Sequence, residues 1–130
     1  MKSVKDYVLE AEAIVKTYDI AQSVQLLDDE GVIFVDLRDA KEVDACGKIP
    51  GAQLASRGML EFYIDPASPF HKAFFALDKQ FVFYCGGGGR SVLAVQRAME
   101  MGLKNVGQVG GGFKAWVKAG EPIETLTDSK

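Results

Sequence analysis

A cysteine, four glycines and an arginine stand together at residues 85–90, in the order Cys85-Gly-Gly-Gly-Gly-Arg90. Residues 81–84 before them form a short apolar run, and the residues after them show helical periodicity. Cys85 therefore lies between a predicted strand and the start of a predicted helix. A helix N-terminus carries unpaired amide groups and a partial positive charge, which favour an anion. Because the thiolate is the nucleophilic form of cysteine, we predict a nucleophile at Cys85.

The glycines extend this interpretation; they are Gly86, Gly87, Gly88 and Gly89. Without Cβ atoms they can turn successive N–H groups towards the sulfur and adopt positive φ at little steric cost. Arg90 adds a guanidinium, which suits a tetrahedral oxyanion. Ordering a glycine costs roughly 0.5 to 1 kcal/mol more than ordering an alanine in regular structure, so four in a row indicate a role. The loop is predicted to be an amide-lined anion site around the thiol.

Nucleotide-binding motifs fit this chain poorly. The P-loop requires G-x-x-x-x-G-K-[ST], and residues 86–91 lack both the spacing and the lysine. Residues 107–112 are only weakly similar to G-x-G-x-x-G. We therefore reject a phosphate-binding nucleotide site at either glycine-rich loop.

The elements that position the loop can be predicted from apolar patterning. Strands are expected at residues 32–35, 81–84 and 106–109, with a shorter one at 52–54. Helices are expected at residues 3–16, after a cap at Asp19 up to a left-handed cap at Gly31, at 59–64, at 71–77, at 91–101 and around Phe113 and Trp116. Phe113 and Trp116 are assigned to the core by their spacing. Strands that alternate with helices predict an α/β fold with a mainly parallel sheet, flanked by helices.

The chain length fits one domain. Its 130 residues are enough for a hydrophobic core without disulfides. We expect a helical extension over residues 1–17, the main domain over 18–124 and a loose tail over 125–130. Two cysteines and one histidine are too few for a disulfide scaffold or a usual four-ligand zinc site.

Charge and hydropathy exclude other classes of protein. The net charge of −3 gives no reason to expect binding to nucleic acid or an acidic membrane. No run of about 20 apolar residues appears. We expect a cytoplasmic protein in a reducing compartment, with no membrane partner.

Three motifs resemble the rhodanese-like sulfurtransferase family, in the order that the family has them. The loop Cys85-Gly-Gly-Gly88-Gly-Arg90 matches C-x-x-G-x-R. Upstream, residues 36–42 and 47–52 are similar to D-x-R-x-x-x-E and G-H-I-P-G-A, with Lys48 in place of the histidine and Val43 where an aromatic often stands. Downstream, residues 111–122 are similar to G-G-[FWY]-x-A-W-x-x-A-G-x-P. The resemblance extends over residues 18–123 and implies a single α/β domain with a mainly parallel sheet of about five strands.

The resemblance implies a two-step transfer of sulfur without a metal or organic cofactor. The Cys85 thiolate would take the outer sulfur of a small donor such as thiosulfate and become a persulfide. Cyanide, a small thiol or a protein thiol would then accept the sulfur. Thiosulfate-adapted members often carry a cation among the middle loop positions, whereas these positions are glycine here and Arg90 is the charged residue of the loop.

Two other functions are compatible with the sequence. One is a non-catalytic module that carries or senses sulfur or binds a partner through the same pocket. The other is a phosphatase, since cell-cycle tyrosine phosphatases share the fold. Their loop has five residues between cysteine and arginine, whereas residues 86–89 are four. The shorter loop favours a sulfur atom over a phosphoryl group.

Several other polar residues are assigned structural roles. Asp36 and Arg38 follow a buried strand and are expected to brace loops. Arg57 is interpreted as solvated rather than lining the pocket, and His71 as a surface residue. Cys46 is interpreted as a loop thiol, with a redox role alongside Cys85 as the alternative.

Overall fold

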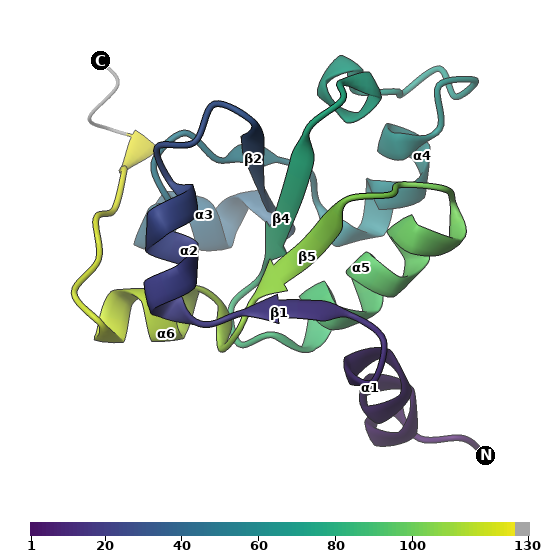
Figure 1. Ribbon diagram of the computed structural model, residues 1–130, viewed down its shortest axis with the longest axis horizontal. Helices are drawn as coiled ribbons and strands as arrows, with labels where there is room; N and C mark the ends of the chain where they lie inside the picture. The colour runs from purple at the N-terminus through teal and green to yellow at the C-terminus, as the bar shows by residue number, and fades with distance from the viewer. Residues whose placement is uncertain (127–130) are drawn as a thin grey trace.

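The computed structural model describes residues 1–126 and shows a parallel sheet between two layers of helices (Figure 1). The strand order is β1-β5-β4-β2-β3, and every pair of neighbours is parallel. The strands are β1 (Lys16–Tyr18), β2 (Val32–Asp36), β3 (Gln53–Leu54), β4 (Gln80–Tyr84) and β5 (Val106–Val109). The α-helices are α1 (Val4–Glu12), α2 (Ile20–Leu26), α3 (Ala40–Cys46), α4 (Leu60–Ile64), α5 (Gly89–Glu100) and α6 (Gly112–Lys118). The predicted α/β class and the five-stranded sheet are confirmed.

The central strand β4 is buried on both faces, as its unbroken apolar run predicted. Phe81 and Phe83 point into a core that α1, α4 and α5 cover. Val82 and Tyr84 point to the opposite face, into a core shared with α2 and α6. Figure 1 shows these two sets of helices on opposite sides of the sheet. All four side chains are at most 2% exposed, so the strand is fixed from both sides.

The N-terminal segment differs from the prediction. The helix expected over residues 3–16 ends at Glu12, and Lys16–Tyr18 form the edge strand β1 beside β5. Lys16 and Thr17 are exposed, and three residues are too few to show an alternating apolar pattern. The proposed extension over residues 1–17 thus includes two residues of the sheet.

Two other predicted elements are corrected by the structure. Helix α2 is capped by Asp19 as predicted, but it ends at Leu26, and Gly31 does not have a positive φ. Instead, the Gly31 N–H donates to the Asp29 carboxylate at 2.8 Å, a local turn that replaces a helix cap. The helix expected at residues 71–77 is only a 3₁₀ turn over Ala73–Ala76.

The carboxyl ends of β4 and β5 carry the two glycine-rich loops, which therefore meet at one edge of the sheet (Figure 1). Of the proposed tail at residues 125–130, residues 127–130 lie outside the described residues. No helix within residues 1–126 is both long and apolar enough to cross a membrane.

Candidate active site

Cys85 follows the last residue of β4 directly and is 1% exposed. Gly88 is the N-cap of α5 and has a φ of 105°, a conformation that a residue with a Cβ rarely adopts. This turn lets the Gly88 N–H donate to the Cys85 Sγ at 3.1 Å. Among the four glycines of the loop, Gly88 supplies the backbone N–H that forms this hydrogen bond to sulfur, while Gly89 is the first residue of the helix. The arrangement places the sulfur at the positive end of α5.

The second glycine-rich loop holds the backbone of the first. The N–H groups of Phe113 and Lys114, in the first turn of α6, donate to the carbonyls of Cys85 and Gly86 at 2.8 and 3.0 Å. A Cβ on Gly112 would lie 2.6 Å from the Cys85 carbonyl oxygen and 2.7 Å from that of Gly86. Glycine at position 112 therefore permits a close backbone contact that fixes the thiol-bearing residue. The sequence indicated a glycine-rich loop after the strand at residues 106–109, but it did not indicate that Gly112 packs against the backbone of Cys85.

A chain of polar side chains lies behind the thiol. The Cys85 Sγ is 3.6 Å from the Ser91 Oγ, which donates to the Gln108 Oε1 at 2.7 Å. The Gln108 Nε2 donates to the Thr17 Oγ1 at 3.0 Å. Ser91 and Gln108 are buried, so these bonds satisfy polar groups that would otherwise be costly to bury. This chain of polar residues was not predicted from the sequence, although the glutamine within the apolar strand β5 could have indicated it.

Arg90 is paired with Glu42 on α3. The guanidinium donates to both carboxylate oxygens, at 2.8 and 3.0 Å. The hydrogen bond from Arg90 lowers the pKa of Glu42 to about 2, and the carboxylate raises the pKa of Arg90. The cation that the sequence led us to assign to an oxyanion is thus already neutralised by Glu42, and this pair joins α3 to the start of α5.

We expect this ion pair to make stability depend on pH in acid. Because the pKa of Glu42 falls from 4.5 to about 2 on folding, the stabilisation is complete above about 4.5 and is lost as the pH falls through about 2. The side chains are 41% and 38% exposed, so solvent limits the gain to about 1 kcal/mol or less. Urea unfolding should show Glu42→Gln less stable than the wild type at about pH 6, with a smaller difference at about pH 3. An equal difference at both pH values would contradict this assignment.

Asp36 and Arg38 form a buried ion pair that braces the loop after α3, as expected. The Arg38 guanidinium donates to the Asp36 carboxylate at 2.7 Å and to the Gly47 carbonyl at 2.6 Å, and it lies 4.1 Å from the centre of the Phe113 ring. Phe113 and Trp116 are themselves buried, which confirms their place in the core. The brace therefore ties the end of β2 to the loop after α3 and to α6.

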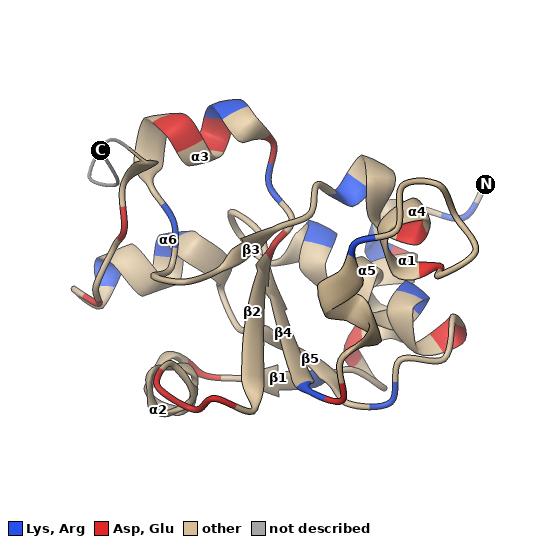
Figure 2. Ribbon diagram, turned by 90° about the horizontal axis from the view of Figure 1, so that it is seen from above, with Lys and Arg blue, Asp and Glu red and all other residues tan. Residues whose placement is uncertain are grey.

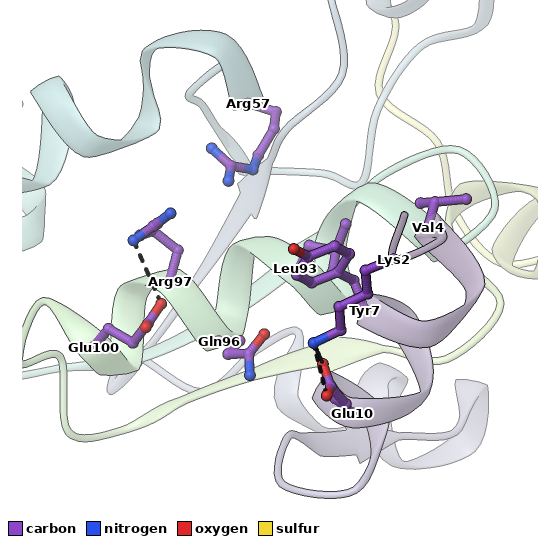
Figure 3. Close-up of a pocket in the computed structure, with 9 residues that line it drawn as sticks. All are labelled: Lys2, Val4, Tyr7, Glu10, Arg57, Leu93, Gln96, Arg97 and Glu100. Carbon is purple, nitrogen blue, oxygen red and sulfur yellow. Dashed lines mark hydrogen bonds and ion pairs between the residues drawn. The ribbon is translucent and has the colours of Figure 1, made fainter.

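The remaining predicted residues lie away from the thiol or beside its loop. Arg57 pairs with Glu61 and lines an outer cavity of about 550 Å³ between α1 and α5, where Figure 3 shows it across from Arg97. The His71 Nδ1 lies 3.0 Å from the Tyr63 carbonyl oxygen. Cys46 is an exposed free thiol at the end of α3, and Cys85 is also free.

Two cavities adjoin the glycine loop from opposite sides. The first, the α3–α6 cavity, has a volume of about 390 Å³ and is lined by Gly86 together with Lys41, Cys46 and Lys114. Figure 2 shows basic positions on both of these helices. The second, the glycine-loop cavity, has a volume of about 420 Å³ and lies among residues 87–89, residues 110–111, Thr17, Gln108 and two side chains of α1, Val8 and Glu12. Both cavities are lined by glycines of the loop, whereas Cys85 itself is buried and lines neither of them.

Comparison with known proteins shows the family. The family model for the rhodanese-like domain matches residues 19–119. A thiosulfate sulfurtransferase GlpE from Pseudoalteromonas translucida is 33% identical over 104 residues, which cover 80% of this chain and 90% of that protein. A sulfurtransferase from Allochromatium vinosum is 33% identical over 101 residues, covering 78% of this chain and 86% of the other.

A solved structure from Rhodopseudomonas palustris superimposes with a TM-score of 0.93 and 47% sequence identity, covering 95% of this chain and 96% of that one. That protein is described as of unknown function and a possible tyrosine phosphatase. The fold and the site define an α/β domain that presents a thiol between a parallel strand and a helix. The chain belongs to the rhodanese-like domain family, which confirms the resemblance seen in its motifs.

Proposed function

We propose that this protein is a sulfurtransferase that carries sulfur on Cys85. The observation that supports this most is the Gly88 N–H, which donates to the buried Cys85 Sγ at the N-terminus of α5. An amide donor and a helix terminus both stabilise negative charge on sulfur, in the thiolate and in a persulfide. The names of the relatives, thiosulfate sulfurtransferase and sulfurtransferase, favour the same chemistry.

The proposed reaction has two steps. In the first, the Cys85 thiolate attacks the outer sulfur of a donor such as thiosulfate, an S–S bond forms, and the donor's own S–S bond breaks. Sulfite leaves with the electron pair of that bond, and Cys85 becomes a persulfide. In the second, cyanide or a thiolate attacks the outer sulfur, and the bonding pair returns to Cys85 as the thiolate. Covalent catalysis of this kind divides one difficult transfer into two easier ones.

Mass spectrometry of the wild-type protein tests the first step. After incubation with thiosulfate and removal of the excess, the peptide that contains Cys85 should gain the mass of one sulfur atom. Cyanide should remove this sulfur and release thiocyanate. Cys46→Ser is the matched control, since Cys46 is the other cysteine of the chain, and it should load sulfur to the same extent. Sulfur found on Cys46 instead of Cys85 would contradict the proposal. A persulfide that forms but passes to no small acceptor would indicate a sulfur carrier instead of an enzyme.

A phosphatase is the second candidate, because the similar Rhodopseudomonas palustris protein is described as a possible tyrosine phosphatase. The loop offers four residues between Cys85 and Arg90, one fewer than the phosphatases of this fold have. In addition, the Arg90 guanidinium that a phosphoryl group would need is held by Glu42. We therefore expect no hydrolysis of an aryl phosphate, and rapid hydrolysis that requires Cys85 would favour the phosphatase.

A further inference from the structure

The glycine-loop cavity brings the first helix of the chain to the proposed active site. Residues 87–89 form one wall of this cavity, and Val8 and Glu12 of α1 line it from another element. Gly88, whose N–H holds the Cys85 Sγ, is one of the lining residues. The family match begins at residue 19, so α1 lies outside it. The contribution of α1 to the cavity therefore comes from outside the part of the chain that the family model matches.

Glu12 is the charged side chain of this cavity. The other residues that line it are apolar, uncharged polar or glycine. Within residues 1–126, Glu12 takes part in none of the ion pairs or side-chain hydrogen bonds that the structure shows. Its neighbour Glu10 differs, because it pairs with Lys2 at 2.6 Å and lines the outer cavity, as Figure 3 shows. Glu10 and Glu12 of the same helix thus line different cavities, and among the described residues Glu10 is paired with a cation whereas Glu12 is not.

The α3–α6 cavity on the other side of the loop has the opposite character. Lys41 and Lys114 line it, and neither forms an ion pair among the described residues. Its other charged groups, Arg38 and Glu42, are each paired with a partner of opposite sign. The loop therefore has an uncompensated positive side, which suits an anionic sulfur donor, and an uncompensated negative side at Glu12.

We propose that Glu12 makes the glycine-loop cavity selective for acceptor thiols that carry a positive charge, the aminothiols. This inference rests on the proposed sulfurtransferase function. The acceptor thiolate attacks the outer sulfur of the Cys85 persulfide, an S–S bond forms to the acceptor, and the Cys85 thiolate leaves with the old bonding pair. The Glu12 carboxylate attracts the acceptor's ammonium group and repels acceptors that carry a carboxylate. Glu12 is thus a specificity-determining residue for the second step.

Three thiols of similar size test the charge of the acceptor: cysteamine, 2-mercaptoethanol and 3-mercaptopropionate. Cys85 is loaded with sulfur, the donor is removed, and the loss of the persulfide is followed by mass spectrometry against thiol concentration. The intrinsic reactivities of the thiols cancel when each rate constant is compared between the wild type and a Glu12 variant. We expect the ratio of cysteamine to 3-mercaptopropionate to fall about fivefold in Glu12→Gln and about twentyfold in Glu12→Lys. Added salt should weaken this selectivity in the wild type.

Glu10→Gln and Glu10→Lys are the matched controls, since they change the net charge equally on the same helix but face the outer cavity. They should leave the ratio unchanged. An unchanged ratio in both Glu12 variants, or an equal change in the Glu10 variants, would overturn the inference while the persulfide still forms. Failure of the wild type to form a persulfide would instead overturn the proposed function. Thermal unfolding of each variant shows that a changed ratio reflects selectivity and not loss of the fold.

Discussion

Cys85→Ser should lose about 10³-fold or more of the thiocyanate production from thiosulfate and cyanide, because it removes the nucleophile of both steps. A serine hydroxyl is not ionised near neutral pH, and its oxygen cannot carry the transferred sulfur as a persulfide. The fold should survive, since serine is no larger than cysteine and its Oγ can accept the bond that the Gly88 N–H now donates to sulfur. Thiocyanate assays and mass spectrometry of the loaded protein measure the effect.

Cys46→Ser supplies the comparison for this prediction. Cys46 is exposed at the end of α3 and lines the same α3–α6 cavity as Gly86, whereas Cys85 is buried in the loop. We expect Cys46→Ser to keep thiocyanate production within about twofold of the wild type, because our proposed steps do not use it. Full activity in Cys85→Ser would remove the basis of the proposed function. A loss of activity in Cys46→Ser would contradict our proposed steps, which use Cys85 alone.

The parts of this site that could be predicted from the sequence are local in the chain. The apolar run at residues 81–84, the cysteine after it and the helical pattern from residue 91 lie next to one another. Each can be predicted from the conformational preferences of residues that are adjacent in the sequence, and the structure shows β4, the loop and α5 in that order. The same local logic explains why Asp19 was correctly predicted as a helix cap, since its partner Gln22 is three residues away.

The parts that could not be predicted depend on contacts between distant residues. Glu42 and Arg90 are 48 positions apart, and their pairing requires α3 to lie beside the start of α5. Thr17 and Gln108 are 91 positions apart and meet because β1 pairs with β5. Since Lys16 was assigned to the end of a helix and no strand was predicted at residues 16–18, neither β1 nor the polar chain that it completes was expected. The charge at the loop therefore depends on tertiary contacts, which the local sequence does not indicate.

Gly112→Ala should be the most destabilising of the substitutions that we propose, by about 3 kcal/mol. Gly112 has a φ of 65°, and a Cβ there would lie 2.6 Å from the Cys85 carbonyl oxygen. Alanine would have to move α6 away from the loop, which weakens the bonds from the Phe113 and Lys114 N–H groups. Urea unfolding measures the free energy, and the rate of sulfur loading on Cys85 measures the effect on the site.

Gly120→Ala separates backbone strain from the close contact. Gly120 lies just after the other end of α6 and has a φ of 76°, but a Cβ there would have no heavy atom within 4 Å. Gly120→Ala should lower the free energy of unfolding by about 1 kcal/mol because of the positive φ alone, and it should leave the rate of sulfur loading unchanged. If Gly112→Ala were no more costly than Gly120→Ala, the close backbone contact would not fix the loop. If instead Gly112→Ala alone slows loading, the second glycine-rich loop positions the thiol through its contacts with the backbone of Cys85 and Gly86.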